Sequence, residues 1–235
     1  MNKERERAIL QILVERKKVT TKELSAALYA SEPSIRRDLC ELEKKRLLRR
    51  VHGGAQIDES ALSDIKLPFL LREIESRDEK IKIAGRAAEL VHDGDTVFLD
   101  ASTSAYSILP FLAEKSDLIV ITNGIRALTY LGEANINCIG TGGEVMNSCL
   151  AFVGEDACRS VEKYNADICF FSCRGLSEDG RLTDISKQEN EVRIRMIGRS
   201  ERAYMLCTAD KKGRLFYHTI CRKEDIDGVI TSQGL

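Results

Sequence analysis

Apolar residues near the N-terminus recur at the spacing of an amphipathic helix. A helix over residues 2–18 is predicted by one apolar stripe, which consists of Ala8, Ile9, Ile12 and Leu13. The pattern Thr20-x-x-Glu23 is typical of a helix start, because each side chain can cap a backbone N–H group of the other. It predicts a second, short helix that runs to Tyr29.

A third helix is expected to start at Ser31, with Pro33 in its first turn, where a missing N–H group costs nothing. Its core stripe is Ile35, Leu39 and Leu42. The gap of about three residues between the second and third helices is that of a helix-turn-helix. Residues 47–55 are short and contain a turn, as a β-hairpin would. Residues 1–57 are therefore predicted to form a winged helix-turn-helix domain.

Residues 58–75 are predicted to form a linker, which contains Pro68. In the remaining domain, 76–235, short apolar runs alternate with helical segments, which is typical of a parallel sheet covered on both faces. The fold class is thus α/β behind an N-terminal winged helix. The runs lie at 96–99, 118–121, 136–139, 168–171, 204–207 and 229–230, and the helical segments begin near 77, 104, 125, 155 and 188.

Charge is unevenly divided along the chain. Residues 1–55 carry 14 Lys or Arg against 8 Asp or Glu, whereas the other 180 residues carry a net charge of −7. A basic N-terminal segment followed by an acidic remainder favours a nucleic-acid-binding module joined to a second domain. The alternative is a solvated charged face on the first helix.

The eight cysteines contain no Cys-x-x-Cys pair, and the three histidines lie far apart, so we expect no metal site and no cofactor. Several cysteines lie in apolar runs, where Cys packs as a small hydrophobic residue. The charged N-terminus does not resemble a signal peptide, and no apolar run approaches the ~18 residues needed to span a bilayer. We therefore expect a cytoplasmic protein that makes no membrane contact.

Two sequence motifs resemble the signature of DeoR-family bacterial transcription regulators. They are RRDLCEL at 36–42 and LRRVHGGA at 48–55, which occur at the family's separation. Further segments follow in the order of that family's sensor domain: 93–96, 98–100, 122–123, 142–144 and 152–154. The resemblance implies a repressor of carbohydrate metabolism that binds double-stranded operator DNA, responds to a phosphorylated sugar and forms a homo-oligomer. It also implies a sensor fold related to ribose-5-phosphate isomerase.

On the third helix, Arg37 points away from the core stripe and is expected to read a base, because its guanidinium matches O6 and N7 of guanine. Ser34 is a second candidate. The alternative is that Arg36 and Arg37 only pair with acids such as Asp38 or Glu41. Other basic side chains are expected to hold phosphates. The predicted DNA-binding set is Thr20, Thr21, Ser31, Ser34, Arg36, Arg37, Arg49, Arg50, His52 and Gly53.

Polar loops follow several of the predicted strands, and parallel α/β sheets bind ligands at the carboxyl ends of their strands. Asp100 ends one strand and Ser102 opens the next helix, where exposed N–H groups favour an anion. The alternative is that Ser102 or Thr103 only caps that helix. The predicted effector-binding set is Asp100, Ser102, Thr103, Ser104, Thr122, Asn123, Gly143, Glu144, Arg174, Glu189 and Lys211.

Within this set, Lys211 and Arg174 are expected to neutralise a phosphate, while Asp100 and Glu189 accept sugar hydroxyls. Glu189 can equally belong to the charged face of a helix. Two other functions remain open at this point. One is a sugar-phosphate isomerase-like enzyme, which would need a carboxylate base such as Asp100 beside its substrate. The other is a regulator controlled by cysteine oxidation.

Overall fold

The computed structural model describes residues 3–44, 47–56 and 69–235. They belong to two compact units, Met1–Ser76 and Arg77–Leu235, hereafter the N-terminal and C-terminal units.

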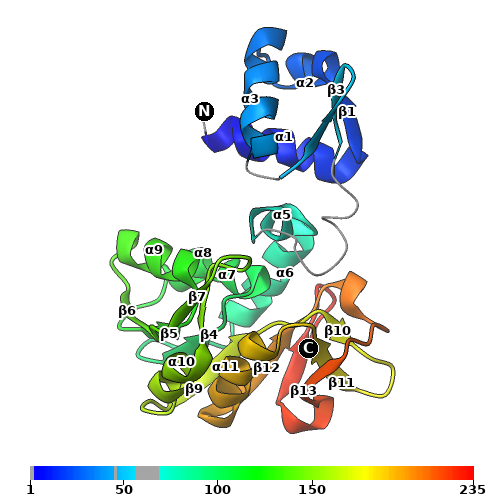
Figure 1. The fold of residues 1–235 in the computed structure, drawn as a ribbon. Coiled ribbons are helices and arrows are strands. Elements are labelled where there is room, and N and C mark those ends of the chain that lie inside the picture. The colour runs from blue at the N-terminus through cyan, green and yellow to red at the C-terminus, as the bar shows by residue number, and fades with distance from the viewer. Residues whose placement is uncertain (1–2, 45–46, 57–68) are drawn as a thin grey trace. The chain divides into compact units, whose positions relative to one another are not determined.

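The N-terminal unit contains the predicted winged helix-turn-helix (Figure 1). Its core holds the stripes expected from the sequence, including Ile9, Leu13, Leu24, Ile35 and Leu39. The three-stranded antiparallel sheet has the order β1-β3-β2, so the third strand pairs with both others. The elements are α1 Lys3–Arg16, β1 Lys18–Thr20, α2 Thr21–Ala27, α3 Glu32–Lys44, β2 Arg49–Val51 and β3 Gly54–Gln56.

A further helix, α5 (Phe69–Ile74), packs against α1 in the same unit. Leu71 on this helix is fully buried in the N-terminal core. This part of the predicted linker is therefore helical and packed, while residues 58–68 of that linker lie outside the described residues.

Six parallel strands form the main sheet of the C-terminal unit, in the order β14-β12-β9-β4-β5-β6. All six predicted strands are present, and β4 and β9 lie side by side at its centre. The strands are β4 Thr96–Leu99, β5 Ile119–Thr122, β6 Asn137–Gly140, β9 Ala166–Phe171, β12 Ser200–Leu206 and β14 Gly228–Ile230.

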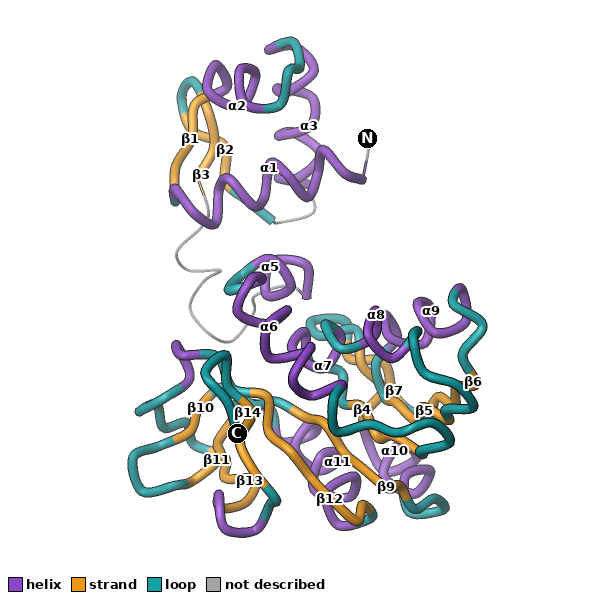
Figure 2. Tube along the Cα trace, turned by 180° about the vertical axis from the view of Figure 1, so that it is seen from behind, coloured by secondary structure: helices purple, strands orange, loops and turns teal. Residues whose placement is uncertain are grey.

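Helices cover both faces of this sheet, as the continuous apolar strands predict. Within β4, Val97 and Leu99 pack toward α6 to α9, whereas Phe98 packs on the opposite side with α10 and α11. Figure 2 shows α6 and α7 in front of the strands and α10 and α11 behind them. The helices are α6 Arg77–Ala88, α7 Thr103–Tyr106, α8 Leu109–Leu112, α9 Ile125–Glu133, α10 Gly154–Val161 and α11 Lys187–Gly198.

Several features of the C-terminal unit were not predicted. The helix expected over 104–114 is divided into α7 and α8, with Pro110 in the first turn of α8. A hairpin and a separate antiparallel sheet of order β10-β11-β13 are additional. Their strands are β7 Glu144–Met146, β8 Ala151–Val153, β10 Gly175–Leu176, β11 Arg181–Asp184 and β13 His218–Arg222, and short 3-10 turns lie at η1 Ala209–Lys211 and η2 Lys223–Asp225.

Candidate DNA interface and ligand site

Helix α3 buries its apolar stripe and leaves its basic side chains exposed. Arg37 is exposed, and its Nε donates to the Pro33 carbonyl oxygen at 3.4 Å. Arg36 pairs with Glu32, one turn earlier, at 3.2 Å. For Arg36, pairing with a nearby acid is what the alternative expected, although the partner is Glu32. Glu41 pairs with Lys44 at 2.8 Å, and Asp38 is held by α1.

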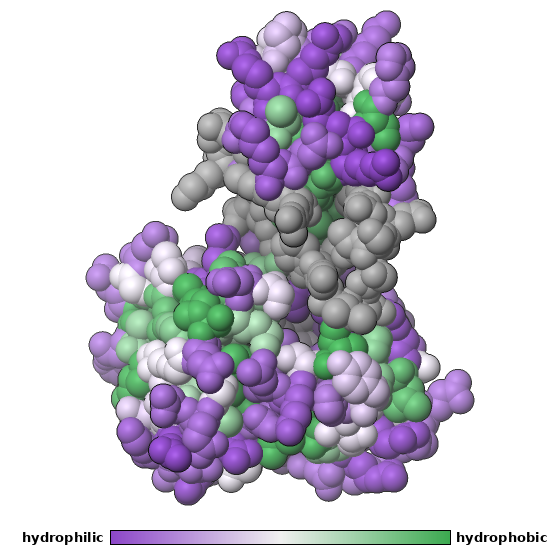
Figure 3. Space-filling view, viewed as in Figure 1, coloured by the Kyte–Doolittle hydropathy of each residue, from purple (hydrophilic) through white to green (hydrophobic). Residues whose placement is uncertain are grey.

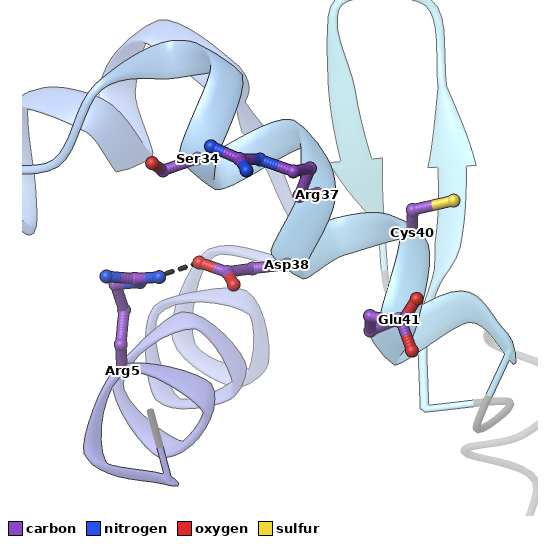
Figure 4. Close-up of a pocket in the computed structure, with 6 residues that line it drawn as sticks. All are labelled: Arg5, Ser34, Arg37, Asp38, Cys40 and Glu41. Atoms are coloured by element: carbon purple, nitrogen blue, oxygen red, sulfur yellow. Dashed lines mark hydrogen bonds and ion pairs between the residues drawn. The ribbon is translucent and has the colours of Figure 1, made fainter. Parts of the chain in front are cut away.

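Asp38 has a partner that the sequence analysis missed. Its Oδ2 accepts a 2.6 Å hydrogen bond from Nε of Arg5, which reaches across from α1 (Figure 4). The bond raises the pKa of the Arg5 guanidinium, which stays charged. The sequence contained a signal for this pair. Asp38 lies three residues after Ile35 and four before Leu42, on the core side of α3, where a carboxylate needs a partner.

The start of α2 forms the predicted capping box. Glu23 N–H donates to Thr20 Oγ1 at 3.1 Å, and Glu23 Oε2 accepts from the Thr20 N–H at 2.7 Å. Thr21 is buried, and its N–H donates to the Gly53 carbonyl at 2.8 Å, so its side chain is poorly placed for DNA. The Ser31 hydroxyl donates to Ser34 Oγ at 3.1 Å at the start of α3.

The wing, the turn between β2 and β3, exposes the side chains expected to hold phosphates. Arg49, Arg50 and His52 are exposed, and Gly53 forms the turn with φ +78°. Gly54, the next residue, has a packing role inside the unit. An added Cβ there would lie 2.2 Å from the Val19 carbonyl oxygen, so the glycine lets β3 pack on β1. Polar residues dominate the visible surface of this unit (Figure 3).

At the carboxyl end of β4, Asp100 is 2% exposed and fully engaged. Its Oδ1 accepts from the Ser102 N–H at 3.1 Å, and its Oδ2 accepts from Arg193 Nε at 2.8 Å and the Ser172 N–H at 3.4 Å. Asp100 therefore connects the loops that follow β4 and β9. Because these contacts occupy both of its oxygens, a role in binding sugar hydroxyls is not favoured. Ser102 caps α7 by accepting from the Ala105 N–H at 3.1 Å, as the capping alternative held.

The central feature of this edge is a buried arginine, Arg193 on α11, which the sequence analysis missed. Besides Asp100, it binds Asp184 at 3.0 Å, Glu189 at 3.3 Å and Asn190 at 2.9 Å. Burial alone would lower the pKa of Arg193, but the three carboxylates more than reverse this and raise it, so the side chain is always charged. The four-residue spacing from Glu189 was the available signal.

Glu189 is thus neither on an exposed helix face nor free for a ligand. Asp184, at the end of β11, also contacts Arg174 at 3.5 Å. The cluster brings the predicted residues Asp100, Glu189 and Arg174 together around Arg193. Its three carboxylates exceed its two arginines by one, so the cluster itself carries one net negative charge.

Lys211, on η1, reaches back to the loops after β4 and β9. Its Nζ donates to Ser104 Oγ at 3.2 Å and to Ser172 Oγ at 2.6 Å, while the Ser172 hydroxyl donates to the Leu206 carbonyl oxygen. In the described part of the chain, this half-buried ammonium is hydrogen-bonded to hydroxyls and is paired with no carboxylate. A cation held between hydroxyls at this edge of the sheet suits an anionic ligand.

The loop after β5 meets the β7–β8 hairpin. Thr122 Oγ1 accepts from the Gly124 N–H at 3.0 Å, and Asn123 Nδ2 donates to the Phe152 carbonyl at 3.0 Å. Asn123 Oδ1 is buried and has no partner among the described residues. The hairpin also packs on Ala101 through Cys149, Ala151 and Val153. The loops after β4 and β5 therefore converge with this hairpin.

The glycine that begins the hairpin serves its packing. Gly143 has φ +109°, and an added Cβ would lie 2.7 Å from the Val153 carbonyl oxygen. Glu144 is exposed and lies opposite Val153 in the strand register. The close approach to Val153 explains Gly143 without a ligand.

The buried cysteines have the properties of core residues. Burial raises the pKa of Cys173 to about 12 and also raises the pKa of Cys169 and Cys207, so these thiols remain protonated and unreactive. This disfavours control by oxidation of these three cysteines. In the described ranges, no cluster of three His, Cys, Asp or Glu side chains is arranged to hold a metal, and no helix is long and apolar enough to cross a membrane.

Residues 5–61 match the family model of the DeoR-like helix-turn-helix domain, and residues 75–233 match that of the DeoR C terminal sensor domain. The chain belongs to the DeoR family of transcriptional regulators. It is 36% identical to the uncharacterized HTH-type transcriptional regulator YulB of Bacillus subtilis (strain 168), over 99% of this chain and 89% of that protein. The regulator is therefore a DNA-binding transcription factor rather than an enzyme.

Two further similarities are more distant. The regulator is 27% identical to the glycerol-3-phosphate regulon repressor of Escherichia coli (strain K12), over 90% of this chain and 83% of that protein. Among solved structures, ribose 5-phosphate isomerase A from Methanocaldococcus jannaschii is 18% identical, with a TM-score of 0.45 over 60% of this chain and 57% of that one.

Proposed function

We propose that the regulator represses an operon of carbohydrate metabolism and is controlled by a phosphorylated sugar bound at the carboxyl edge of its parallel sheet. The observation that carries this proposal is Lys211, whose ammonium lies between the hydroxyls of Ser104 and Ser172 with no carboxylate partner in the described contacts. The relative named for the glycerol-3-phosphate regulon supports a phosphorylated effector.

A phosphate at Lys211 would be bound mainly by charge-assisted hydrogen bonds. The ammonium has three N–H donors, of which two are directed at Ser104 and Ser172, so one remains for a phosphate, and the hydroxyl of Ser104 on α7 can donate another hydrogen bond. Thr103 and Ser102 lie on the same turn, although Ser102 already caps α7. Arg174, about a fifth exposed at the edge of the Arg193 cluster, supplies a second positive charge.

The sugar would be recognised by groups other than those first expected. Asp100 and Glu189 are occupied by Arg193. By contrast, Asn123 Oδ1 and Asn190 Nδ2 are a buried acceptor and a buried donor without partners in the described structure. Buried polar atoms of this kind are normally satisfied, and sugar hydroxyls can both donate and accept. These two amides are our candidates for sugar contacts.

On DNA, Arg37 and Ser34 would read bases while Arg36, Arg49, Arg50 and His52 hold phosphates. We further propose that the regulator acts in the cytoplasm as a homo-oligomer, because paired half-sites on DNA match a symmetric protein. Light scattering coupled to size-exclusion chromatography measures that state directly. A monomer at micromolar concentration, with and without DNA, would contradict it.

A thermal-shift screen of phosphorylated sugars tests the effector proposal. A ligand at 100 times its dissociation constant adds about 2.7 kcal/mol of stability. Calorimetric titration of Lys211→Met with the resulting compound should then show at least a tenfold loss of affinity, because 1.4 kcal/mol is tenfold. Lys212→Met is the matched control, since Lys212 is the exposed neighbour on the same segment. Equal affinities for both variants would contradict the site.

A further inference from the structure

A salt bridge between α1 and α3 lies next to the residues expected to read DNA. Arg5 Nε and Asp38 Oδ2 are 2.6 Å apart, and their side chains are 31% and 7% exposed. Arg5 and Asp38 line a hollow together with Ser34, Arg37, Cys40 and Glu41. Figure 4 shows Arg5 approaching from α1 while the other side chains project from successive turns of α3.

Stability alone does not explain a carboxylate on the buried side of α3. Removing a carboxylate from water costs several kcal/mol, and well-packed apolar residues often replace such pairs with equal or greater stability. The surrounding positions on this side of the helix, Ile35, Leu39 and Leu42, are apolar. A use beyond packing is therefore expected for the pair.

The geometry of the pair suggests that use. The bond to Asp38 engages Nε, which is one edge of the guanidinium, and Figure 4 shows the opposite end of the group pointing away from Asp38. The Nη groups are strong donors with the planar arrangement that suits a phosphate. Binding a phosphate would cost Arg5 little further side-chain freedom, because Asp38 already holds the side chain in place.

We propose that Arg5 binds a phosphate of the DNA backbone and that Asp38 is its positioning residue. The ligand is a backbone phosphate beside the groove that α3 enters, so the contact adds affinity and fixes the register of α3 without reading sequence. The neighbouring charges are consistent with this assignment: Arg37 faces the same hollow, and Glu41 is paired with Lys44.

The test measures binding of the full-length regulator to a random-sequence 30-base-pair duplex as a function of salt, so no operator is needed. Loss of one phosphate contact lowers the slope of log K against log salt by about 0.9 per bound chain. We expect this lower slope from Arg5→Gln. Its affinity should then be about eightfold below that of the wild type at 0.1 M salt if the two are equal at 1 M salt, because a slope difference of about 0.9 acts over one decade of salt concentration. The control is Arg159→Gln in the C-terminal unit. It removes an exposed arginine that pairs with Glu155 one helical turn away, and it should change neither the slope nor the affinity.

Asp38→Asn gives a test that depends on sign. If the carboxylate acted only through its charge, its removal near DNA would raise affinity. As a positioning residue, its loss should lower affinity in the wild type and have no effect in the Arg5→Gln background. The double variant, Arg5→Gln with Asp38→Asn, leaves no unpaired buried charge. If Arg5→Gln alone folds poorly, the salt slope can therefore still be measured in the double variant.

Thermal unfolding followed by circular dichroism accompanies each variant. An unchanged salt slope in both Arg5→Gln and the double variant, together with a lowered melting temperature, would overturn the proposal and leave a purely structural ion pair. Tighter binding by Asp38→Asn would overturn the positioning role.

Discussion

Arg193 and Asp100 are 93 positions apart, yet Arg193 Nε lies 2.8 Å from Asp100 Oδ2 in the interior of the C-terminal unit. This bond joins α11 to the end of β4. Because the same Asp100 oxygen accepts the Ser172 N–H after β9, the pair connects the two central strands of the sheet at the edge where a ligand is expected.

Arg193→Met should strongly destabilise the C-terminal unit. The substitution leaves three buried carboxylates without their shared cation, and breaking a buried pair in this way costs about 3–5 kcal/mol. Urea unfolding followed by circular dichroism measures the loss. Arg199→Met, which changes an exposed arginine at the end of the same helix, should shift the free energy of unfolding by less than about 0.5 kcal/mol. Equal effects of the two substitutions would refute this account of the cluster.

Two adjacent glycines in the wing should respond differently to the same substitution. Gly53 has positive φ with open space around it, so Gly53→Asn should cost little, since Asn tolerates this conformation. Gly54→Asn places a Cβ 2.2 Å from the Val19 carbonyl oxygen and should cost at least about 1–3 kcal/mol, the usual range for overpacking. Thermal unfolding of both variants makes the comparison, and a greater loss from Gly53→Asn would contradict the packing argument.

Arg37→Ala and Arg50→Ala should separate base reading from phosphate binding. Both side chains are exposed, but Arg37 lies on α3 and Arg50 on the wing. Loss of Arg37 should weaken binding to an operator, recovered by selection from random duplexes, by about 1–3 kcal/mol more than binding to random DNA. Loss of Arg50 should weaken both equally and reduce the salt slope by about one unit. If Arg50→Ala instead weakened operator binding selectively and Arg37→Ala weakened both equally, Arg50 would be the base-reading residue and Arg37 the phosphate contact.

Alkaline pH should destabilise the C-terminal unit through its buried thiols. The pKa of Cys173 is raised to about 12 in the folded protein by burial, whereas an unfolded thiol titrates near 9. The folded state therefore keeps a proton that the unfolded state releases, so this contribution is complete below pH 9 and is lost as pH rises toward 12. Urea midpoints at pH 8 and 9.5 should fall with pH, and less steeply in Cys173→Ala. A midpoint that does not fall would contradict it.

The sequence alone determined the order and type of most elements. Stripes at helical spacing, the Thr20–Glu23 capping box and continuous apolar strands depend on local periodicity, and local periodicity is visible in one sequence. The motifs at 36–42 and 48–55 together indicated the family, and the outward position of Arg37 followed from the turn of an ideal helix. The short strands of the β10-β11-β13 sheet lacked such a signal, because β10 spans two residues and β11 and β13 contain many polar residues.

Only the tertiary structure decided which charges meet. Asp100 and Glu189 do come together in the fold, but both are paired with the same buried cation, Arg193, which no local pattern predicted. Arg5 and Asp38 come from different helices, 33 positions apart. Periodicity shows which face of an element is buried, whereas an ion pair depends on how two elements lie against each other. That relation arises only when the whole chain packs.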